Sequence, residues 1–181
     1  MDPLPAVLTG SHVVARVAFL SVELDRYRDH DGSEFERVVI RHPGAVAVVP
    51  IDDGHVIFVR QFRAPLGALM LEIPAGILDI ENEPLEMAAT RECEEETGYR
   101  PGRLEHLRTI NTTPGFSDER IDLFLATDLT EVGARPDGIE ERHAEIIRLS
   151  FAEVRSAIAD GSITDAKTLI GLLEGMPRWA S

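Results

Sequence analysis

The segment from Pro84 to Gly98 is the part of this sequence that most restricts the fold. Nothing between these two residues breaks a helix. Proline suits the first turn of a helix, and glycine is the usual residue just beyond the last turn. The segment therefore predicts a helix over residues 84–97. Its expected buried stripe consists of four apolar side chains: Leu85, Ala88, Ala89 and Cys93.

The glutamates of this helix do not all lie opposite its apolar stripe. At about 100° per residue, Glu92 and Glu96 fall within about 20° of Leu85, inside the stripe. Glu95 lies at its edge, and Glu94, about 180° from Leu85, points to solvent. Most acidic runs form a solvated helix face, and that interpretation is the alternative here.

Two carboxylates on a buried stripe need a counter-charge. Without one, burying Glu92 and Glu96 together costs several kcal/mol or strongly raises their pKa values. The two residues are one helical turn apart, so both carboxylates can reach a single hard cation. Oxygen donors alone favour Mg²⁺ or Mn²⁺ over zinc. Arg91 and Glu95 have the same spacing, and we expect this pair to hold the carboxylates in place.

The rest of the chain is rich in strand patterns. Runs of alternating or β-branched apolar residues predict strands at 11–24, 35–40, 45–51, 55–62, 69–73, 107–112, 120–126 and 144–149. Charged, turn-forming residues at 27–32 separate the first two of these strands. Asp52, Asp53 and Gly54 predict a hairpin between the third and the fourth.

Two further helices are expected near the C-terminus. Ser150 and Glu153 have the spacing of a capping box, ahead of a helix that Gly161 ends. A last helix is expected over residues 164–173. Many strands with few helices favour an α/β or α+β sandwich with a mixed sheet.

A turn at His42, Pro43 and Gly44 divides the chain into two expected parts. Residues 1–43 form an N-terminal β segment with too few strands to stand as an independent domain. Residues 44–181 form the main domain.

The charge balance excludes two classes of partner. With 18 Lys and Arg against 32 Asp and Glu, the net charge is -14. Nucleic acids and anionic membranes select basic surfaces, so neither is an expected partner. An anionic substrate remains compatible if a divalent metal lies between it and the protein. The single cysteine excludes an internal disulfide, and without a signal-peptide or membrane-spanning pattern we expect a cytoplasmic protein.

The segment from Gly76 to Tyr99 resembles the Nudix box. Residues 91–99, Arg-Glu-Cys-Glu-Glu-Glu-Thr-Gly-Tyr, match the second half of that motif throughout. Glu83 precedes Arg91 at the distance that the motif requires, but one extra residue separates Gly76 from Glu83. We interpret it as an insertion in the loop ahead of the helix. The resemblance implies a Nudix α/β/α sandwich with a mixed sheet, preceded by a small N-terminal antiparallel β segment.

Three flanking segments are similar to the ADP-ribose pyrophosphatases of this superfamily. Residues 59–63 and 71–76 resemble the approach to the box in those enzymes. Pro114 stands at the spacing after the box that marks the same group, and residues 161–167 are also similar.

The resemblance implies a set of metal ligands. The Ala75 carbonyl, Glu92 and Glu96 would hold the ions, and Glu95 would assist. Since three or four carboxylates exceed the needs of one Mg²⁺, two or more Mg²⁺ or Mn²⁺ ions are expected per site. Arg91 and Glu95 are also expected to act in catalysis.

The sequence does not assign the general base to a single residue. In this family a glutamate on a late loop takes that role, and here Glu140 and Glu141 are both candidates. Glu145 is a weaker one, and each of the three is alternatively an ordinary surface charge. His143 is tempting as a base, but a lone loop histidine is more often only solvated.

Substrate contacts are expected from two regions. Arg60 and Arg63 are expected to share one strand face, where guanidinium groups could bind a pyrophosphate or be ordinary edge charges. Glu72 is expected near the substrate, or alternatively as the structural partner of a strand-end arginine. The loop after the box contributes Pro114, Ser117 and Glu119. Alternatively, Pro114 begins a simple turn.

These residues together favour metal-dependent hydrolysis of ADP-ribose to AMP and ribose 5-phosphate. One alternative keeps the reaction and changes the substrate to a GDP- or ADP-linked hexose. Another is a Nudix-fold sensor that binds a nucleotide without turnover, although the chain keeps Glu92, Glu95 and Glu96. In this family the N-terminal strands pair with a second subunit, which implies a homodimer.

Overall fold

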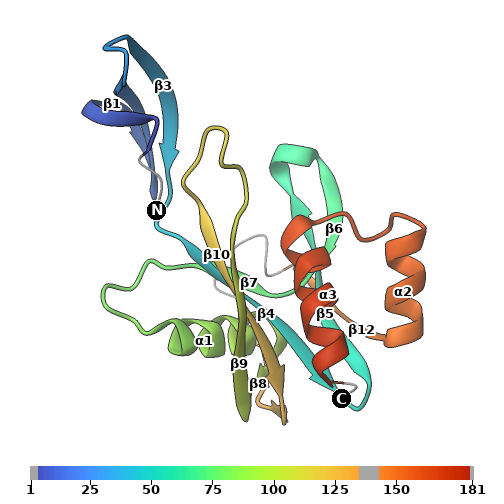
Figure 1. The fold of residues 1–181 in the computed structure, drawn as a ribbon. Coiled ribbons are helices and arrows are strands. Elements are labelled where there is room, and N and C mark those ends of the chain that lie inside the picture. The colour runs from blue at the N-terminus through green and yellow to red at the C-terminus, as the bar shows by residue number, and fades with distance from the viewer. Residues whose placement is uncertain (1–3, 135–142, 180–181) are drawn as a thin grey trace. The chain divides into compact units, whose positions relative to one another are not determined.

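The computed structural model describes residues 4–134 and 143–179 (Figure 1). Its contacts divide the chain into two units. The first unit is Met1–Gly44 with Asn111–Arg120, and the second is Ala45–Ile110 with Ile121–Ser181. Among the described residues, no helix is both long enough and apolar enough to span a lipid bilayer.

A three-stranded antiparallel sheet forms the first unit, in the order β1-β2-β3. Its strands are β1 (Ala6–Val17), β2 (Leu20–Asp29) and β3 (Glu34–Arg41). The single strand predicted at 11–24 is wrong, because the chain reverses at Ala18, whose φ is 50°. The predicted turn at 27–32 is also too long. β2 continues to Asp29 because its charges are paired across the ladder, as in the ion pair of Arg28 with Glu34 at 2.9 Å.

The second unit contains a seven-stranded mixed sheet in the order β12-β5-β4-β10-β9. Its central strands β4 and β10 are parallel, and β5 joins β4 through the expected antiparallel hairpin. Two short strands pair off this path, β6 with β5 and β7 with β4. The bounds are β4 (Ala45–Asp52), β5 (His55–Arg63), β6 (Ala68–Glu72), β7 (Ala75–Ile77), β9 (Arg103–Asn111), β10 (Arg120–Thr127) and β12 (Glu145–Ser150).

Smaller elements complete this unit. A 3-10 turn, η1 (Ala64–Leu66), lies between β5 and β6. The strands β8 (Tyr99–Arg100) and β11 (Thr130–Glu131) form an antiparallel pair that the sequence patterns do not reveal, because each has only two residues.

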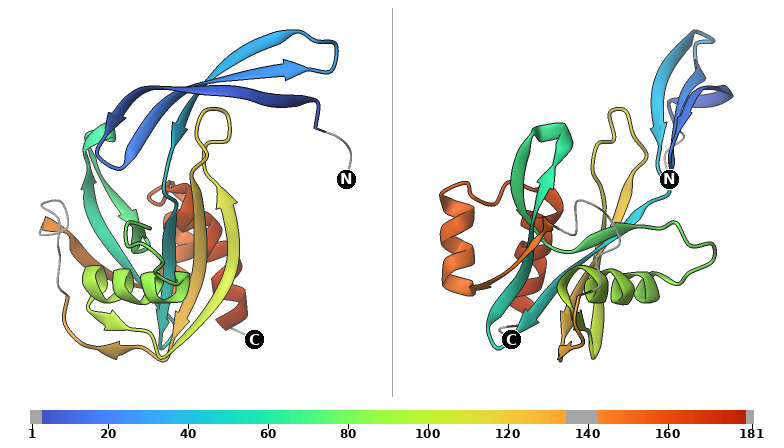
Figure 2. Two further views of the ribbon diagram at one scale, coloured as in Figure 1. Left: turned by 90° about the vertical axis from the view of Figure 1, so that its left-hand side faces the viewer. Right: turned by 180° about the vertical axis from the view of Figure 1, so that it is seen from behind.

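Helices cover both faces of the mixed sheet, as Figure 2 shows. Strand β4 is buried along almost its whole length, and its side chains alternate between two core clusters. Val46 and Val48 pack with α1 (Leu85–Thr97), whereas Val49 packs with α3 (Ala166–Trp179). Together with α2 (Phe151–Ala159), these layers make an α/β/α sandwich, which confirms the predicted fold class.

The C-terminal helices differ from prediction mainly at one end. The capping box at Ser150 and Glu153 is present. Helix α3, predicted to end at 173, continues to Trp179. Its glycines look like helix breakers in the sequence, but a Cβ on Gly171 would lie 2.9 Å from Val49 Cγ2. The glycine therefore allows the helix to pack closely on the sheet.

Candidate active site

Helix α1 buries two of its glutamates, as the helix periodicity predicts. Glu92 and Glu96 are each only 9% exposed, alongside Ala88, Ala89 and Cys93 at 0%. Gly98 ends the helix with a φ of 77°, in the left-handed conformation expected of that position. Burial raises the pKa of the Cys93 thiol to about 12, which excludes it as a nucleophile at neutral pH.

The segment that follows β6 closes over these two carboxylates. The Ala75 N–H donates to Glu96 Oε2 at 3.2 Å. Gly76 lies directly against the other carboxyl group, because a Cβ there would be 2.0 Å from Glu92 Cδ. Ala75, Glu92 and Glu96, the predicted metal ligands, therefore lie together in the second unit.

Arg91 links several carboxylates around this site. Its guanidinium binds Glu83 through Nε and Nη2, at 3.1 and 2.9 Å. Its Nη1 binds Glu92 at 2.5 Å and Glu95 at 3.4 Å. The hydrogen bonds to Glu83 raise the pKa of Arg91. Desolvation acts to lower it, but the nearby charge of Glu92 adds to the rise, and the net pKa lies above its ordinary value. Arg91 Nη2 also lies 3.9 Å from Asp79 Oδ1. Among the described residues, one cation thus faces four carboxylates, and this excess of negative charge suits a divalent metal.

The loop ahead of the helix accommodates its extra residue without losing this contact. Asn82 has a φ of 60°, and asparagine is among the residues that best tolerate the left-handed region. Glu83 consequently reaches Arg91, with a side chain that is only 9% exposed.

The donor chemistry of this site fits a hard divalent cation. The two buried carboxylates, Glu92 and Glu96, supply oxygen donors only. Within residues 4–134 and 143–179, no three His, Cys, Asp or Glu side chains are grouped closely enough to hold a metal by themselves. A cation here would therefore need the backbone oxygen, as the resemblance implies, together with water or substrate oxygens.

A second polar cluster lies beside this site, around Glu72. Arg63 donates to both carboxylate oxygens of Glu72, at 2.8 and 2.7 Å, and Lys167 Nζ contacts the same carboxylate. Burial acts to raise the pKa of Glu72, but the two cations outweigh it and the pKa lies below its ordinary value. These contacts match the alternative interpretation of Glu72, in which it is the structural partner of a strand-end arginine, here Arg63.

The expectation that Arg60 and Arg63 share one strand face is wrong. Side chains alternate along a strand, so residues three apart point to opposite sides. Arg60 lies on the exposed side of β5 and pairs with Glu145 at 3.3 Å. Arg63 lies on the opposite side of the strand, the side of the buried Gln61. Glu145, the weaker candidate for the base, is engaged in this ion pair.

Pro114, Ser117 and Glu119 belong to the first unit, on a loop fixed to β3. Ser117 Oγ donates to the Ile40 carbonyl at 3.0 Å and accepts from the Glu119 N–H at 3.2 Å. Glu119 also accepts a hydrogen bond from Thr112 Oγ1. The loop is thus ordered by its own polar contacts, and the substrate roles of its residues stay predictions.

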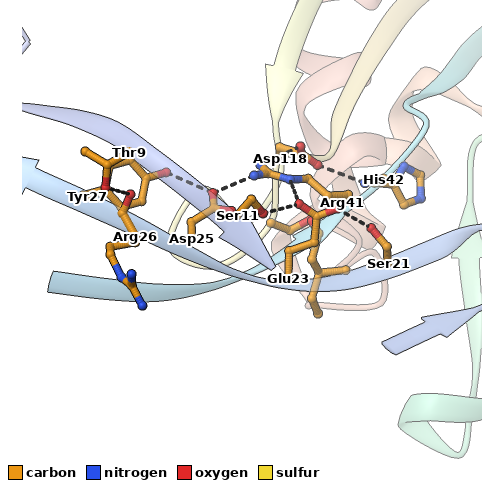
Figure 3. Close-up of polar contacts among 12 residues, drawn as sticks. Thr9, Ser11, Ser21, Glu23, Asp25, Arg26, Tyr27, Arg41, His42 and Asp118 are labelled. Atoms are coloured by element: carbon orange, nitrogen blue, oxygen red, sulfur yellow. Dashed lines mark hydrogen bonds and ion pairs between the residues drawn. The ribbon is translucent and has the colours of Figure 1, made fainter. Parts of the chain in front are cut away.

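Arg41, which the sequence does not single out, organises this loop. Figure 3 shows it between Glu23, Asp25 and Asp118, and Nη2 donates to Asp25 Oδ2 at 2.6 Å. Desolvation lowers the pKa of Arg41, but hydrogen bonds to the three carboxylates outweigh it and raise the pKa. Asp25 is fully buried, and its Oδ1 has no hydrogen-bond partner in the described part of the chain.

The two principal candidates for the general base, Glu140 and Glu141, lie outside the described residues. His143, the tempting alternative, is exposed.

Comparison with known proteins identifies the class to which this fold and carboxylate helix belong. Residues 41–169 match the family model described as the NUDIX domain. The chain therefore belongs to the Nudix hydrolase family, and the resemblance of residues 76–99 to the Nudix box is confirmed at the level of family.

Individual relatives show which members of this family the chain is similar to. The chain is 38% identical to the ADP-ribose pyrophosphatase of Bacillus subtilis, over 76% of this chain and 75% of the relative. It is 36% identical to the ADP-ribose pyrophosphatase of Mycobacterium tuberculosis, over 86% and 76%. It is also 34% identical to a GDP-mannose pyrophosphatase of Cronobacter sakazakii, over 64% and 63%.

A solved structure supports the fold. The crystal structure of an ADP compounds hydrolase superposes with a TM-score of 0.85 and 22% identity, covering 99% of this chain and 96% of the other. This likeness confirms the Nudix sandwich with its N-terminal antiparallel sheet.

Replacing Gly76 with alanine is expected to lower metal-dependent turnover by about 100-fold while the protein stays folded. The new Cβ would displace the Glu92 carboxylate, whose Cδ lies 2.0 Å from that position. Steady-state hydrolysis and thermal unfolding measure the two effects. Gly10→Ala is the matched control, since a Cβ at Gly10 meets nothing within 4 Å. Full activity in Gly76→Ala would contradict the placement of Glu92 in the metal site.

Proposed function

We propose that the protein hydrolyses the pyrophosphate bond of ADP-ribose to give AMP and ribose 5-phosphate. The observation that carries this proposal is the pair of buried carboxylates, Glu92 and Glu96, against the Ala75–Gly76 backbone. Two relatives that are ADP-ribose pyrophosphatases, matched over three quarters or more of their own length, support the choice of substrate.

Mg²⁺ or Mn²⁺, with two or more ions per site, is the proposed cofactor. The Ala75 carbonyl, Glu92 and Glu96 would hold the ions, with Glu95 assisting. Bound there, such ions supply Lewis acidity toward the diphosphate and lower the pKa of a coordinated water. Arg91 holds the Glu92 and Glu95 carboxylates in place through its two ion pairs with them.

Binding and proton removal are assigned to other residues. Arg63 is proposed to face the diphosphate, since its bidentate pair with Glu72 uses Nε and Nη2 and leaves Nη1 outside that pair. Glu140 or Glu141 is proposed as the base that takes the proton of the attacking water. The loop residues Pro114, Ser117 and Glu119 remain proposed substrate contacts, whereas Arg60 points to the other side of β5 from Arg63 and is not proposed to bind the same diphosphate.

A nucleoside diphosphate hexose is the second candidate substrate. The similarity to a GDP-mannose pyrophosphatase supports it, although that match spans 63% of the relative. The same carboxylates would serve the same bond cleavage, so the choice depends on the sugar.

Product analysis with ADP-ribose, with and without Mg²⁺, tests this function. GDP-mannose and ADP-glucose are run in parallel. We expect metal-dependent release of AMP and ribose 5-phosphate, fastest with ADP-ribose. Cleavage of a hexose derivative alone would replace the substrate and keep the mechanism. No turnover of any of the three would overturn the enzyme assignment and favour a nucleotide sensor.

A homodimer formed through the N-terminal strands, in the cytoplasm, completes the proposal. Apolar side chains lie exposed on β1 and at its turn, with Val14 61%, Val17 66% and Phe19 50% exposed. Such a surface is typical of a protein interface. Light scattering is expected to give the mass of two chains, and the mass of one chain would contradict the dimer.

A further inference from the structure

Lys167 is the only lysine among the 18 lysine and arginine residues of this chain. It lies near the start of α3, with a side chain that is only 10% exposed. Its ammonium group contacts the buried carboxylate of Glu72 and lies 3.0 Å from Asp165 Oδ2. An ammonium is compact and can lie between two carboxylates, whereas the broad, planar guanidinium of arginine needs a wider space.

The same end of α3 also holds the backbone next to Glu72. Asp165 Oδ2 accepts hydrogen bonds from the Thr168 N–H at 2.9 Å and from Thr168 Oγ1 at 2.6 Å. Thr168 Oγ1 in turn accepts from the Ile73 N–H at 2.9 Å. Side chain and backbone of residues 72–73 are therefore both fixed by α3, two residues before the segment that touches Glu92 and Glu96.

The charges of this cluster explain why a second cation is needed. Glu72 is only 1% exposed and binds Arg63 through two hydrogen bonds. If Arg63 were its only cation, the two charges would cancel and the guanidinium would attract an anion weakly. Asp165 offsets part of the charge of Lys167, and the remainder acts on Glu72. Lys167 thus shares the negative charge of Glu72, so the positive charge of Arg63 is less fully neutralised.

We propose that Lys167 is a positioning residue for anionic substrate. It holds Glu72 in the orientation that fixes Arg63, and it offsets the charge of Glu72 so that Arg63 attracts a diphosphate. This role rests on the proposed function, in which Arg63 faces the diphosphate. A purely structural role predicts lost stability without a selective change in anion binding.

Lys167→Met removes the charge and keeps the chain length. The dissociation constant of ADP is measured by calorimetry, and kcat and KM are measured with ADP-ribose. We expect the dissociation constant and KM to rise by about tenfold, with kcat within about twofold of wild type. Lys167→Arg restores the charge and is expected to recover part of the lost affinity.

Arg108→Met is the matched control. It removes one cation and one ion pair of α3, the pair with Glu174 at 2.6 Å, without touching Glu72. Its ADP affinity is expected to equal that of wild type.

Asp165→Asn gives a result of opposite sign, which tests the proposal even if Lys167→Met does not fold. Asparagine is also a good N-cap, so α3 keeps its first turn. Removing the negative charge of Asp165 leaves more of the positive charge of Lys167 to offset Glu72. ADP binding is therefore expected to tighten by about two- to threefold, the size of effect expected from one neighbouring charge at a high effective dielectric. A purely structural cap predicts no tightening.

The outcomes separate this inference from the proposed function. Wild-type protein that binds ADP but does not hydrolyse ADP-ribose would contradict the function and leave the ADP comparison to decide the role of Lys167. Unchanged ADP affinity in folded Lys167→Met, or in Asp165→Asn, would overturn the role of Lys167 alone. No measurable ADP binding by the wild type would overturn both the placement of Arg63 and the role of Lys167.

Discussion

Glu96→Gln is expected to lower kcat/KM for metal-dependent hydrolysis on the order of 100-fold or more, without unfolding the protein. The amide keeps the size of the side chain and can still accept from the Ala75 N–H, but it loses the negative charge that a divalent cation requires. Since Glu96 is only 9% exposed and lies near Glu92, losing its charge also relieves repulsion between buried carboxylates. Thermal unfolding is therefore expected at or above the wild-type temperature.

The matched control is Glu94→Gln on the same helix. Glu94 pairs with the exposed Arg100 through two oxygens, away from Ala75 and Gly76. Its activity is expected to stay within about twofold of wild type, because an exposed ion pair contributes little. Near-normal turnover in Glu96→Gln, measured across a Mg²⁺ titration, would remove Glu96 from the metal site.

The helix and its buried acids could be predicted because their causes are local. A 3.6-residue period fixes which side chains share a face, and Pro84 and Gly98 fix the ends. Glu92 and Glu96 therefore follow from residues within four turns of one another. The same holds for the capping box at Ser150, whose two hydrogen bonds span only three residues.

Contacts between residues that are far apart in the sequence could not be predicted. Lys167 and Glu72 are 95 residues apart, and no local pattern indicates that they meet. Arg41 likewise reaches Asp118 across 77 residues. The turn at Ala18 was missed for a different reason, since alanine carries no turn signal and adopts a positive φ only because β1 and β2 pair on either side of it.

Glu72→Gln is expected to destabilise the protein by about 3–5 kcal/mol at pH 7, the cost of breaking a buried ion pair from one side. The amide removes the negative charge that Arg63 and Lys167 both contact, and its N–H₂ group would face one of these donors. Arg63 would then lie beside a neutral group, and Lys167, only 10% exposed, would keep Asp165 as its carboxylate partner. Urea unfolding followed by circular dichroism measures the loss.

Acid should reduce this difference between wild type and Glu72→Gln. The pKa of Glu72 in the folded protein lies below its ordinary value of 4.5, so its contribution is fully present above that value. It is lost as the pH falls through the folded pKa, where the wild-type carboxyl becomes neutral like the amide. Glu105→Gln, which breaks an ion pair with Arg178 that is 39% exposed on both sides, is expected to cost less than about 1 kcal/mol at any pH. A loss in Glu72→Gln as small as in this control would show that the buried cluster contributes no more than a surface pair.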